Sequence, residues 1–390
     1  MPLILFFGLV ATAYTLMNGY MFVRLFSVLK GTGILRGLAC AVFLLFAASF
    51  PASRFLRNFL PRPAADFLFV LGSLYLAPMI NGFLLTLAAD FLRMLNYHLA
   101  LTSNPPYYAD SGRENAVAVI LLLSLFLSFL GAVNAVFPAA REASIQWSGG
   151  RGTESSVKIA LVSDIHLGKI NPLSRLNRIA GLIKSRSPDI VLIAGDTIDD
   201  VSWMRSPERR AAIASVLSSF SPRLGVWAVP GNHEYYSGIE ESAGFLKSCG
   251  INVMRDEWAV PGGEFLLIGR DDLTIARTGK ERASLASIIS SARSALGPAS
   301  RSLPVIVLDH QPFRLEEAEQ AGAALQLSGH THKGQLFPAN LLMALIYEKY
   351  YGLYKKGATN YYITSGAGTW GPPVRTTGRP EVVFIDFFAQ

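Results

Sequence analysis

Histidine is rare in this sequence, and most of its positions fall in short polar motifs in the second half of the chain. Five of the six histidines belong to one ordered set of motifs: Asp164-Ile-His166, Gly195-Asp196, Gly231-Asn232-His233-Glu234, His310 and Gly329-His330-Thr331-His332. A fold has little reason to gather histidine in this way, because imidazole is partly charged near neutral pH. Metal coordination is such a reason, since neutral imidazole and carboxylate hold Zn, Mn or Fe ions.

The spacing of these residues favours two metal ions. Residues two apart at the end of an extended strand share a face, so Asp164 and His166 can reach one ion, and His330 and His332 repeat that spacing. Asp196 has two carboxylate oxygens and can bridge two ions. Seven ligands with one of them shared fit a pair of ions about 3.5–4 Å apart. The candidate ligands are Asp164, His166, Asp196, Asn232, His310, His330 and His332.

Such a metal pair supports phosphoryl chemistry. Two ions lower the pKa of a bound water and stabilise charge on a phosphoryl group during in-line displacement. His233 is adjacent to Asn232, so the two side chains diverge, and His233 can protonate the leaving oxygen. We expect Glu234 to orient His233, as carboxylates often orient histidines. Each motif alone could be an ordinary loop, and it is their joint order that predicts a catalytic site.

The elements that must position these residues are short strands. Apolar, β-rich runs over residues 157–162, 189–194, 225–229, 303–308 and 324–328 each end at one of the motifs. Helical patterns at residues 173–186 and 207–219 separate the first three runs, and residues 361–364 and 381–386 read as further strands. This alternation predicts an α/β layered domain. Loops at the carboxyl ends of neighbouring strands converge, which would bring the candidate ligands together.

The first part of the chain has the composition of a membrane domain. Of 390 residues 51% are hydrophobic and 16% charged, and the mean hydropathy is +0.34. Residues 2–23, 37–59, 67–92 and 116–137 are apolar enough to span a bilayer, whereas a soluble helical bundle would need a polar face. We therefore predict a transmembrane helical domain over residues 1–140, a linker over 141–156 and a catalytic domain over 157–390.

The charge pattern bears on partners and orientation. The net charge is +7, but Lys and Arg are scattered, which favours lipid headgroups over nucleic acid as the partner. Basic residues in the loops on the two sides of the membrane nearly cancel, so the positive-inside rule does not orient the spans. Four crossings would place both ends of the chain on the same side. The sequence carries no signal for an oligomeric state.

The ordered motifs resemble those of the calcineurin-like metallophosphoesterase superfamily, over roughly residue 157 to the end of the sequence. The resemblance implies a four-layer α/β/β/α sandwich, here preceded by an α-helical membrane domain of about four spans. It also implies that His233 is the catalytic acid. We expect two divalent cofactor ions, Mn first, with Zn, Fe or Mg as alternatives. By position, the first metal would be held by Asp164, His166, Asp196 and His332, and the second by Asp196, Asn232, His310 and His330.

Later segments are similar to a membrane-associated bacterial branch of that superfamily. They are residues 269–272, 329–335 and 365–371, with Pro373-Val-Arg375, although several relatives have glycine where Lys333 stands. The branch includes phosphodiesterases and UDP-2,3-diacylglucosamine pyrophosphatases. It thus implies a manganese-type hydrolase of lipid metabolism in the bacterial inner membrane. Because that nucleotide sugar is made in the cytoplasm, we expect a cytoplasmic catalytic domain.

Residues 337–356 follow the last metal motif and mix apolar and tyrosine positions with a basic end. Two interpretations stay open, a helix lying at a membrane surface and an ordinary core helix. The substrate we expect is an amphiphilic phosphodiester or pyrophosphate. The alternatives are an outward-facing phosphatase or phosphodiesterase of cell-envelope phosphates and a non-catalytic, metal-binding membrane scaffold, against which the complete ligand set argues.

Overall fold

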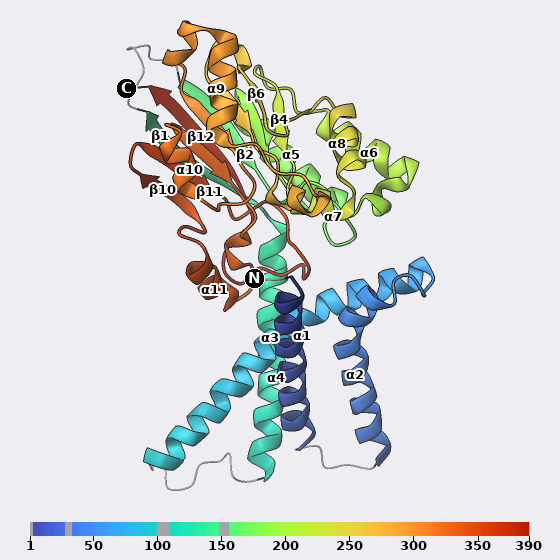
Figure 1. The fold of residues 1–390 in the computed structure, drawn as a ribbon. Helices are drawn as coiled ribbons and strands as arrows, with labels where there is room; N and C mark the ends of the chain where they lie inside the picture. Colours follow the sequence, from blue (N-terminus) through green and yellow to red (C-terminus); the bar gives the residue numbers. More distant parts are fainter. Residues whose placement is uncertain (1–2, 28–32, 100–109, 148–155, 390) are drawn as a thin grey trace. The chain divides into compact units, whose positions relative to one another are not determined.

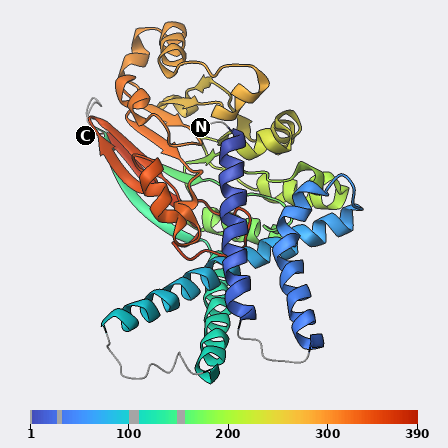
Figure 2. The same cartoon turned by 60° about the horizontal axis from the view of Figure 1, so that its bottom comes forward.

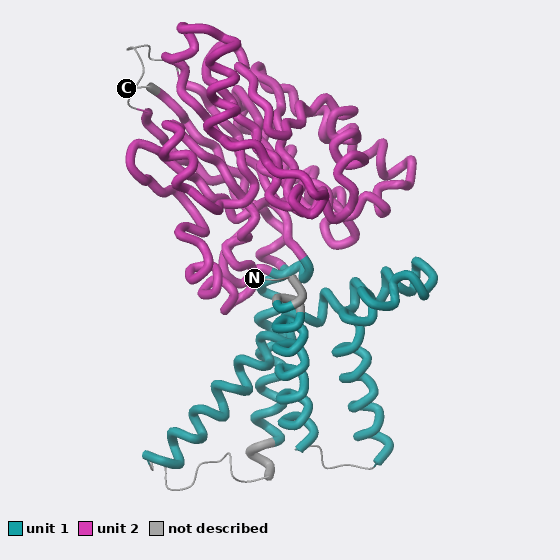
Figure 3. The backbone as a smooth tube through the Cα atoms, viewed as in Figure 1, with its two compact units in different colours: residues 1–132, 371–374 teal, residues 133–370, 375–390 magenta. Residues whose placement is uncertain are grey.

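The computed structural model describes residues 3–27, 33–99, 110–147 and 156–389. The chain divides into two compact units, residues 1–132 with 371–374 and residues 133–370 with 375–390 (Figure 3). We call them the helical unit and the catalytic unit. The helices of the first part of the chain are α1 (Leu3–Phe26), α2 (Gly33–Phe55), α3 (Arg62–Leu99) and α4 (Asp110–Val136).

Three helices in the described part of the chain are long and apolar enough to cross a membrane: α2, α3 and residues Glu114–Val136 of α4. They match the second, third and fourth predicted spans. The first predicted span, residues 2–23, falls on α1 but is not among the three, so this crossing stays a prediction.

Polar side chains connect the helices of the helical unit. Tyr75 donates to Asn18 Oδ1 over 2.6 Å and thereby joins α3 to α1, and Asn81 donates to Ser128 Oγ over 3.0 Å and joins α3 to α4. Between apolar helices, such hydrogen bonds are a main source of specific association. These two hydrogen bonds tie α3 to both α1 and α4.

The catalytic unit contains two six-stranded sheets (Figures 1 and 2). The first sheet has the order β1 (Ala139–Trp147), β12 (Glu381–Ala389), β2 (Ser156–Val162), β3 (Ile190–Ala194), β4 (Val226–Val229) and β5 (Asn252–Val253). The second has the order β10 (Gly352–Lys356), β11 (Thr359–Ile363), β9 (Leu325–Ser328), β8 (Val305–Leu308), β7 (Leu266–Gly269) and β6 (Glu257–Ala259).

The remaining elements of the catalytic unit are helices. The α-helices are α5 (Leu173–Arg186), α6 (Pro207–Leu217), α7 (Asn232–Ser237), α8 (Ile239–Ser248), α9 (Leu285–Leu296), α10 (Leu315–Gln320) and α11 (Ala339–Ile346). The 3-10 helices are η2 (Val201–Arg205), η3 (Pro261–Gly263), η4 (Leu273–Thr278), η5 (Pro298–Ser302) and η6 (His332–Gly334).

Three hydrophobic cores separate four layers. One core packs α5, α6 and α8 against the outer face of the first sheet, through residues such as Ile179 and Phe245. The second core lies between the sheets, where Leu161 of β2 and Leu308 of β8 belong to one cluster. The third packs α9 and α10 against the second sheet. Because both faces of each sheet are covered, inner strands such as β3 and β8 are continuous apolar runs, as is usual for buried parallel strands. The predicted α/β/β/α sandwich is confirmed.

The predicted linker over residues 141–156 is wrong in its first part. Residues 139–147 form β1, which pairs in parallel with all nine residues of β12. Ile145 is buried in the core between the sheets. The alternation of Ile145 with polar neighbours suits a half-buried edge strand, a pattern that composition does not reveal. Residues 148–155 of the predicted linker lie outside the described residues.

The segment 337–356 is also not one helix. Only Ala339–Ile346 is helical, and Gly352–Lys356 forms β10, an edge strand antiparallel to β11. The core-helix interpretation is wrong, because α11 contains no buried residue.

Candidate metal centre

Loops at the carboxyl ends of five strands carry the site. Asp164 and His166 follow β2, Asp196 follows β3, and Asn232 opens α7 after β4. His310 and His330 follow β8 and β9 of the second sheet. Strands β2, β3 and β4 are parallel to one another, and so are β8 and β9. The loops therefore project from the same edge of each sheet, as the sequence predicted.

The backbone at the site adopts a conformation that side chains disfavour. Of the ten described non-glycine residues with positive φ, five are candidate ligands: Asp164, His166, Asp196, His330 and His332, with φ between 49° and 70°. Left-handed backbone costs of order 1–3 kcal/mol per residue and persists where the surroundings enforce it. Here Asp164 N donates to Gly195 O and His166 N to Asp196 O, at 3.0 and 2.9 Å. The left-handed backbone of these five residues is thus held in place by the surrounding structure, and it directs their side chains toward one another.

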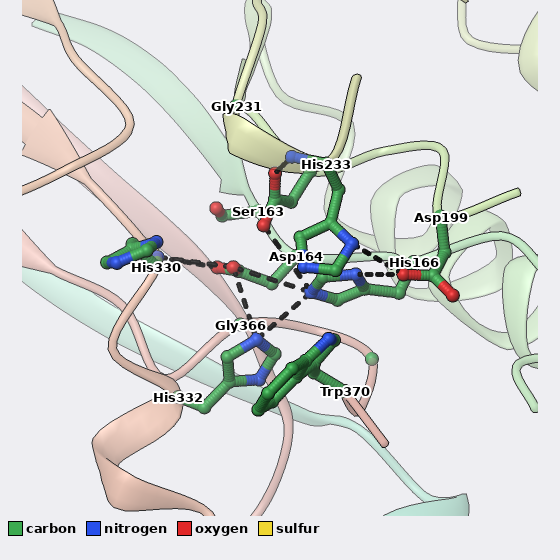
Figure 4. A network of polar contacts seen from close by, with 12 residues as sticks. Ser163, Asp164, His166, Asp199, Gly231, His233, His330, His332, Gly366 and Trp370 are labelled. Carbon is green, nitrogen blue, oxygen red and sulfur yellow. Dashed lines mark hydrogen bonds and ion pairs between the residues drawn. The ribbon is translucent and has the colours of Figure 1, made fainter. Parts of the chain in front are cut away.

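The first group of ligand atoms comes from Asp164, His166 and His332 (Figure 4). The two imidazole Nε2 atoms lie 3.0 Å apart, and His332 Nε2 is 3.4 Å from Asp164 Oδ1. Asp196 Oδ2 approaches His166 Nε2 to 3.7 Å. These four residues are the set that the resemblance implies for the first metal.

The second group comes from Asp196, His310 and His330. His310 Nε2 lies 3.2 Å from Asp196 Oδ2, 3.2 Å from His330 Nδ1 and 3.1 Å from Asn232 Oδ1. His310 Nδ1 donates to Ala194 O over 2.8 Å, which leaves Nε2 with its lone pair toward the group. Asp196 Oδ2 lies 3.2 Å from His310 Nε2 in this group and 3.7 Å from His166 Nε2 in the first, so Asp196 stands between the two groups. The structure thus brings all seven predicted ligands together.

The electrostatics of this cluster suit divalent cations. Burial raises the pKa of Asp164, whereas His310 and its neighbours hold the pKa of Asp196 well below its ordinary value despite burial. Burial and His310 lower the pKa of His330 to about 3. Facing imidazole nitrogens, 3.0–3.2 Å apart and buried beside carboxylates, are the donor set that Zn, Mn and Fe ions prefer. The residues present therefore fit a pair of divalent ions.

Glu234 does not orient His233, so that prediction is wrong. Its buried carboxylate accepts backbone N–H groups from Asp196 at 3.0 Å, Ile198 at 2.8 Å and Gly231 at 2.8 Å. Burial raises its pKa to about 7. Glu234 thus fixes the loop after β3 against the start of α7 and places Asp196 and Asn232, instead of touching the acid.

Asp199 is the residue that orients His233. Its Oδ1 lies 2.6 Å from His233 Nδ1 and 3.4 Å from His166 Nδ1 (Figure 4). Burial alone would lower the pKa of His233, but the carboxylates of Asp196 and Asp199 raise it to about 9. The sequence analysis missed Asp199. The signal available was a second carboxylate three residues after Asp196 in the same loop.

Two glycines allow the loops to come this close. A Cβ on Gly231 would lie 2.2 Å from Asp196 Oδ1. A Cβ on Gly329 would lie 1.9 Å from Ser163 Oγ and 2.4 Å from Asp164 Oδ2. In each case the obstructing atom belongs to, or lies next to, a candidate ligand, so a side chain at either position would displace the metal centre.

Arg375 contacts both the carbonyl and the ring of His332. Its guanidinium is fully buried and donates to the carbonyls of Ser365 at 2.7 Å, Gly368 at 2.7 Å and His332 at 3.3 Å, with Nη2 3.1 Å from His332 Nδ1. Asn134, in the last turn of α4, donates to the Arg375 carbonyl over 2.9 Å. The sequence analysis recognised Arg375 only as part of a branch motif.

Lys333 follows His332 directly. Its ammonium lies 4.0 Å from the centroid of the Tyr351 ring, and its carbonyl accepts the Thr377 hydroxyl over 2.9 Å. Lys333 therefore makes a cation–π contact with Tyr351, in the loop that precedes β10.

Comparisons with known proteins agree with this geometry. Residues 157–334 match the family described as calcineurin-like phosphoesterase. The chain is 30% identical over 317 residues to an uncharacterized metallophosphoesterase of Helicobacter pylori, a match that covers 78% of this chain and 81% of that protein.

Two further relatives have informative names. The phosphodiesterase YaeI of Escherichia coli is 31% identical over 241 residues, which cover 59% of this chain and 81% of that protein. A transmembrane protein with metallophosphoesterase domain from Danio rerio is 33% identical over 288 residues, 70% of this chain and 63% of that protein, so the match spans less than two thirds of that relative. With the ligand cluster, these matches show that the chain belongs to the calcineurin-like phosphoesterase family.

Proposed function

We propose that the chain is a membrane-anchored phosphohydrolase that uses two divalent ions to cleave a phosphodiester or pyrophosphate bond of an amphiphilic, lipid-linked substrate. Membership of the family gives the reaction class, metal-dependent phosphoester hydrolysis. Three apolar helices supply the anchor. The observation that carries the amphiphilic substrate is α11.

Helix α11 is apolar and exposed, and the residue that follows it lies near the metal centre. Leu345 is 84% exposed, and Leu341, Leu342 and Ile346 are each more than half exposed. Tyr347, the next residue after α11, stacks on Phe313 with ring centroids 4.5 Å apart, and its ring lies 6.4 Å from that of His330. A contiguous exposed apolar surface marks an interaction site. Because α11 ends at Tyr347, next to His330, its apolar surface suits the hydrocarbon part of a substrate or the lipid around it.

The residues of the centre have separate tasks in this reaction. When bound, the two ions would activate a water molecule and stabilise charge on the phosphoryl group. Asp164, His166, Asp196 and His332 would hold one ion, and Asp196, Asn232, His310 and His330 the other. His233 Nδ1 donates a hydrogen bond to Asp199 Oδ1. Nε2 is therefore the nitrogen that protonates the leaving oxygen. With a pKa of about 9, His233 carries that proton at neutral pH.

Hydrolysis consumes one water. Its oxygen forms the new bond to phosphorus as the bond from phosphorus to the leaving oxygen breaks, and the water gives up one proton to solvent. The leaving oxygen takes the Nε2 proton of His233, and His233 is protonated again from solvent. Asp199 keeps its hydrogen bond to Nδ1 throughout and holds the ring in one orientation.

The amphiphilic substrate is tested by charging α11. We expect Leu345→Glu to lower kcat/KM for a long-chain diacyl phosphodiester or for UDP-2,3-diacylglucosamine by about 10-fold or more, because a buried leucine contact is worth roughly 1.5–3 kcal/mol. Turnover of soluble bis(4-nitrophenyl) phosphate should not change. Leu296→Glu, at an exposed position of α9, is the matched control. Equal losses on both substrates, or none, would refute the amphiphilic substrate.

We further propose that the catalytic unit faces the cytoplasm from a bacterial inner membrane, with the lipid bilayer and the amphiphile, and no nucleic acid, as its partners. UDP-2,3-diacylglucosamine as a substrate would require this side. An exposed cysteine introduced by Lys280→Cys, two residues after the end of η4, tests the orientation. A membrane-impermeant maleimide should label it only after the cells are lysed. Labelling of intact spheroplasts would favour the outward-facing alternative.

A further inference from the structure

Two large aromatic side chains flank the catalytic acid without being buried by the protein. The Tyr236 ring centroid lies 5.5 Å from that of His233, and the Trp370 ring centroid lies 6.0 Å from it, both edge to face. Tyr236 is 54% exposed and Trp370 is 52% exposed. Tyr236 comes from α7 and Trp370 from the loop between β11 and β12, so two distant segments deliver them to one place. Figure 4 shows the indole beside the histidine cluster.

The protein holds the Trp370 segment although half of the side chain stays exposed. The buried Gln335 side chain donates to Trp370 O over 2.8 Å and accepts from Trp370 N over 2.9 Å. The Gln335 carbonyl in turn accepts Thr376 N over 2.9 Å. A pair of opposed hydrogen bonds to one residue fixes its backbone. The structure therefore presents the indole at a defined place while leaving part of its surface to solvent.

Tyr236 is also half exposed, and a cation lies next to its ring. The Arg277 guanidinium, at the end of η4, lies 4.8 Å from the Tyr236 ring centroid. A ring used only for packing would be covered on both faces, because exposed aromatic surface costs about 25 cal/mol per Å². Exposed aromatic rings fixed beside a reacting group are typical of ligand-binding surfaces.

The position of His233 tells which part of a substrate would meet these rings. Since Nδ1 is engaged by Asp199, the proton leaves from Nε2 to the oxygen of the departing group. The departing group must therefore lie against His233, where Tyr236 and Trp370 are within about 6 Å. The hydrocarbon-binding candidate α11 ends instead at Tyr347, whose ring lies 6.4 Å from that of His330, so the two surfaces would contact different parts of one substrate.

We propose that Tyr236 and Trp370 form a leaving-group subsite that stacks a planar aromatic or heteroaromatic ring, such as a nucleoside base, carried by the departing group. Arg277 supplies a positive charge for an anionic substituent on that group. This inference rests on the proposed phosphodiester hydrolysis, and it adds that the ring-bearing half is released. The phosphoryl group that water attacks stays with the other half.

The test uses benzyl methyl phosphate, a soluble diester in which either alcohol can leave. Benzyl alcohol and methanol have similar acidity, so the product ratio reports the binding orientation. The full-length protein with added Mn should release benzyl alcohol about 10-fold more often than methanol, because ring stacking of this kind changes binding by roughly 5–150-fold. Cyclohexylmethyl methyl phosphate, with a puckered ring of similar size, should show a clearly smaller preference.

Variants separate stacking from a structural role. Trp370→Ala and Tyr236→Ala should each bring the benzyl preference toward one, and Trp370→Phe should restore most of it. Leu296→Ala on α9 should leave the ratio unchanged. A ratio near one in the unmodified protein, or a ratio that both alanine variants leave unchanged, overturns the subsite. Equal loss of both products in Trp370→Ala would mean that the indole only supports His233, and this also overturns it. No turnover of any diester would refute the proposed function itself.

Discussion

Replacing Asp199 by asparagine tests whether this carboxylate sets the acidity of His233. Asp199 Oδ1 accepts from His233 Nδ1 over 2.6 Å, and together with Asp196 it raises the pKa of His233 to about 9 against the effect of burial. A hydrogen bond to a charged group contributes about 1.5–3 kcal/mol. Since one pKa unit corresponds to about 1.4 kcal/mol, neutralising Asp199 should lower the pKa of His233 by about one to two units.

The measured quantity is the pH dependence of kcat for a diester with a poor leaving group. His233 acts as an acid, so activity falls as pH rises through its pKa. The alkaline fall in activity of the Asp199→Asn variant should therefore begin about one to two pH units lower than in the unmodified protein. Above that limb its kcat should be roughly 10–100-fold lower. A nitrophenyl leaving group needs no proton, and its release should be much less affected.

Asp200→Asn is the matched control for this experiment. The Asp200 carboxylate accepts from Ser202 Oγ at 2.5 Å and Trp203 N at 3.2 Å and pairs with Lys169 at 2.9 Å, so it serves η2. It should not move the alkaline limb. Elemental analysis must show full metal content in Asp199→Asn, because Asp199 also lies 3.4 Å from His166. An unmoved limb at full metal content would refute the assignment. So would a further loss when Asp199→Asn is added to His233→Ala, since two residues of one unit should not be additive.

Other perturbations test the remaining parts of the centre. Asp196→Asn or Asn232→Ala should remove nearly all turnover, and full activity at saturating Mn would sink the two-metal assignment. Gly231→Ala should lower metal content by elemental analysis, because its Cβ would lie 2.2 Å from Asp196 Oδ1, whereas Gly244→Ala in α8, with open space around it, should not. Chelation should lower the melting temperature and Mn should restore it, since ions that bind only the folded state stabilise it; an unchanged melting temperature would contradict the fit. A fragment that begins at residue 138 should hydrolyse a soluble diester, but one that begins at residue 156 should be less stable, because it lacks β1 and the buried Ile145; equal melting temperatures would contradict this.

The candidate ligands were predictable because each follows a run that can only be a buried strand. Residues 190–194, for example, are all apolar and end at Gly195-Asp196. The residues that position the ligands and the catalytic acid, Glu234 and Asp199, were not predictable in the same way. Glu234 acts through backbone N–H groups of two loops, and Asp199 through the ring of a histidine from another strand. Such partners depend on how loops from separate strands meet, which spacing along one chain does not encode.

Long-range pairing also explains the errors in the boundaries. Residues 139–147 contain Arg141, Glu142 and three alanines, a composition with little intrinsic strand preference. Their strand exists because β12 provides a ladder for all nine residues. Residues 352–356 likewise become a strand through β11, although their leucine, tyrosine and two lysines suit a surface helix equally well.

The position of β12 has a consequence for how the protein is made. In the first sheet β12 lies between β1 and β2, so it separates the two strands that leave the ribosome first. Roughly 220 residues must be translated after β2 before β12 appears, which takes tens of seconds at about 5–20 residues per second. Until then β1 and β2 have no partner on their facing edges, and the core between the sheets lacks Val383, Ile385 and Phe387. The metal centre therefore assembles only after translation has passed β12, and a nascent chain that stalls earlier exposes two sheet edges instead of an active enzyme.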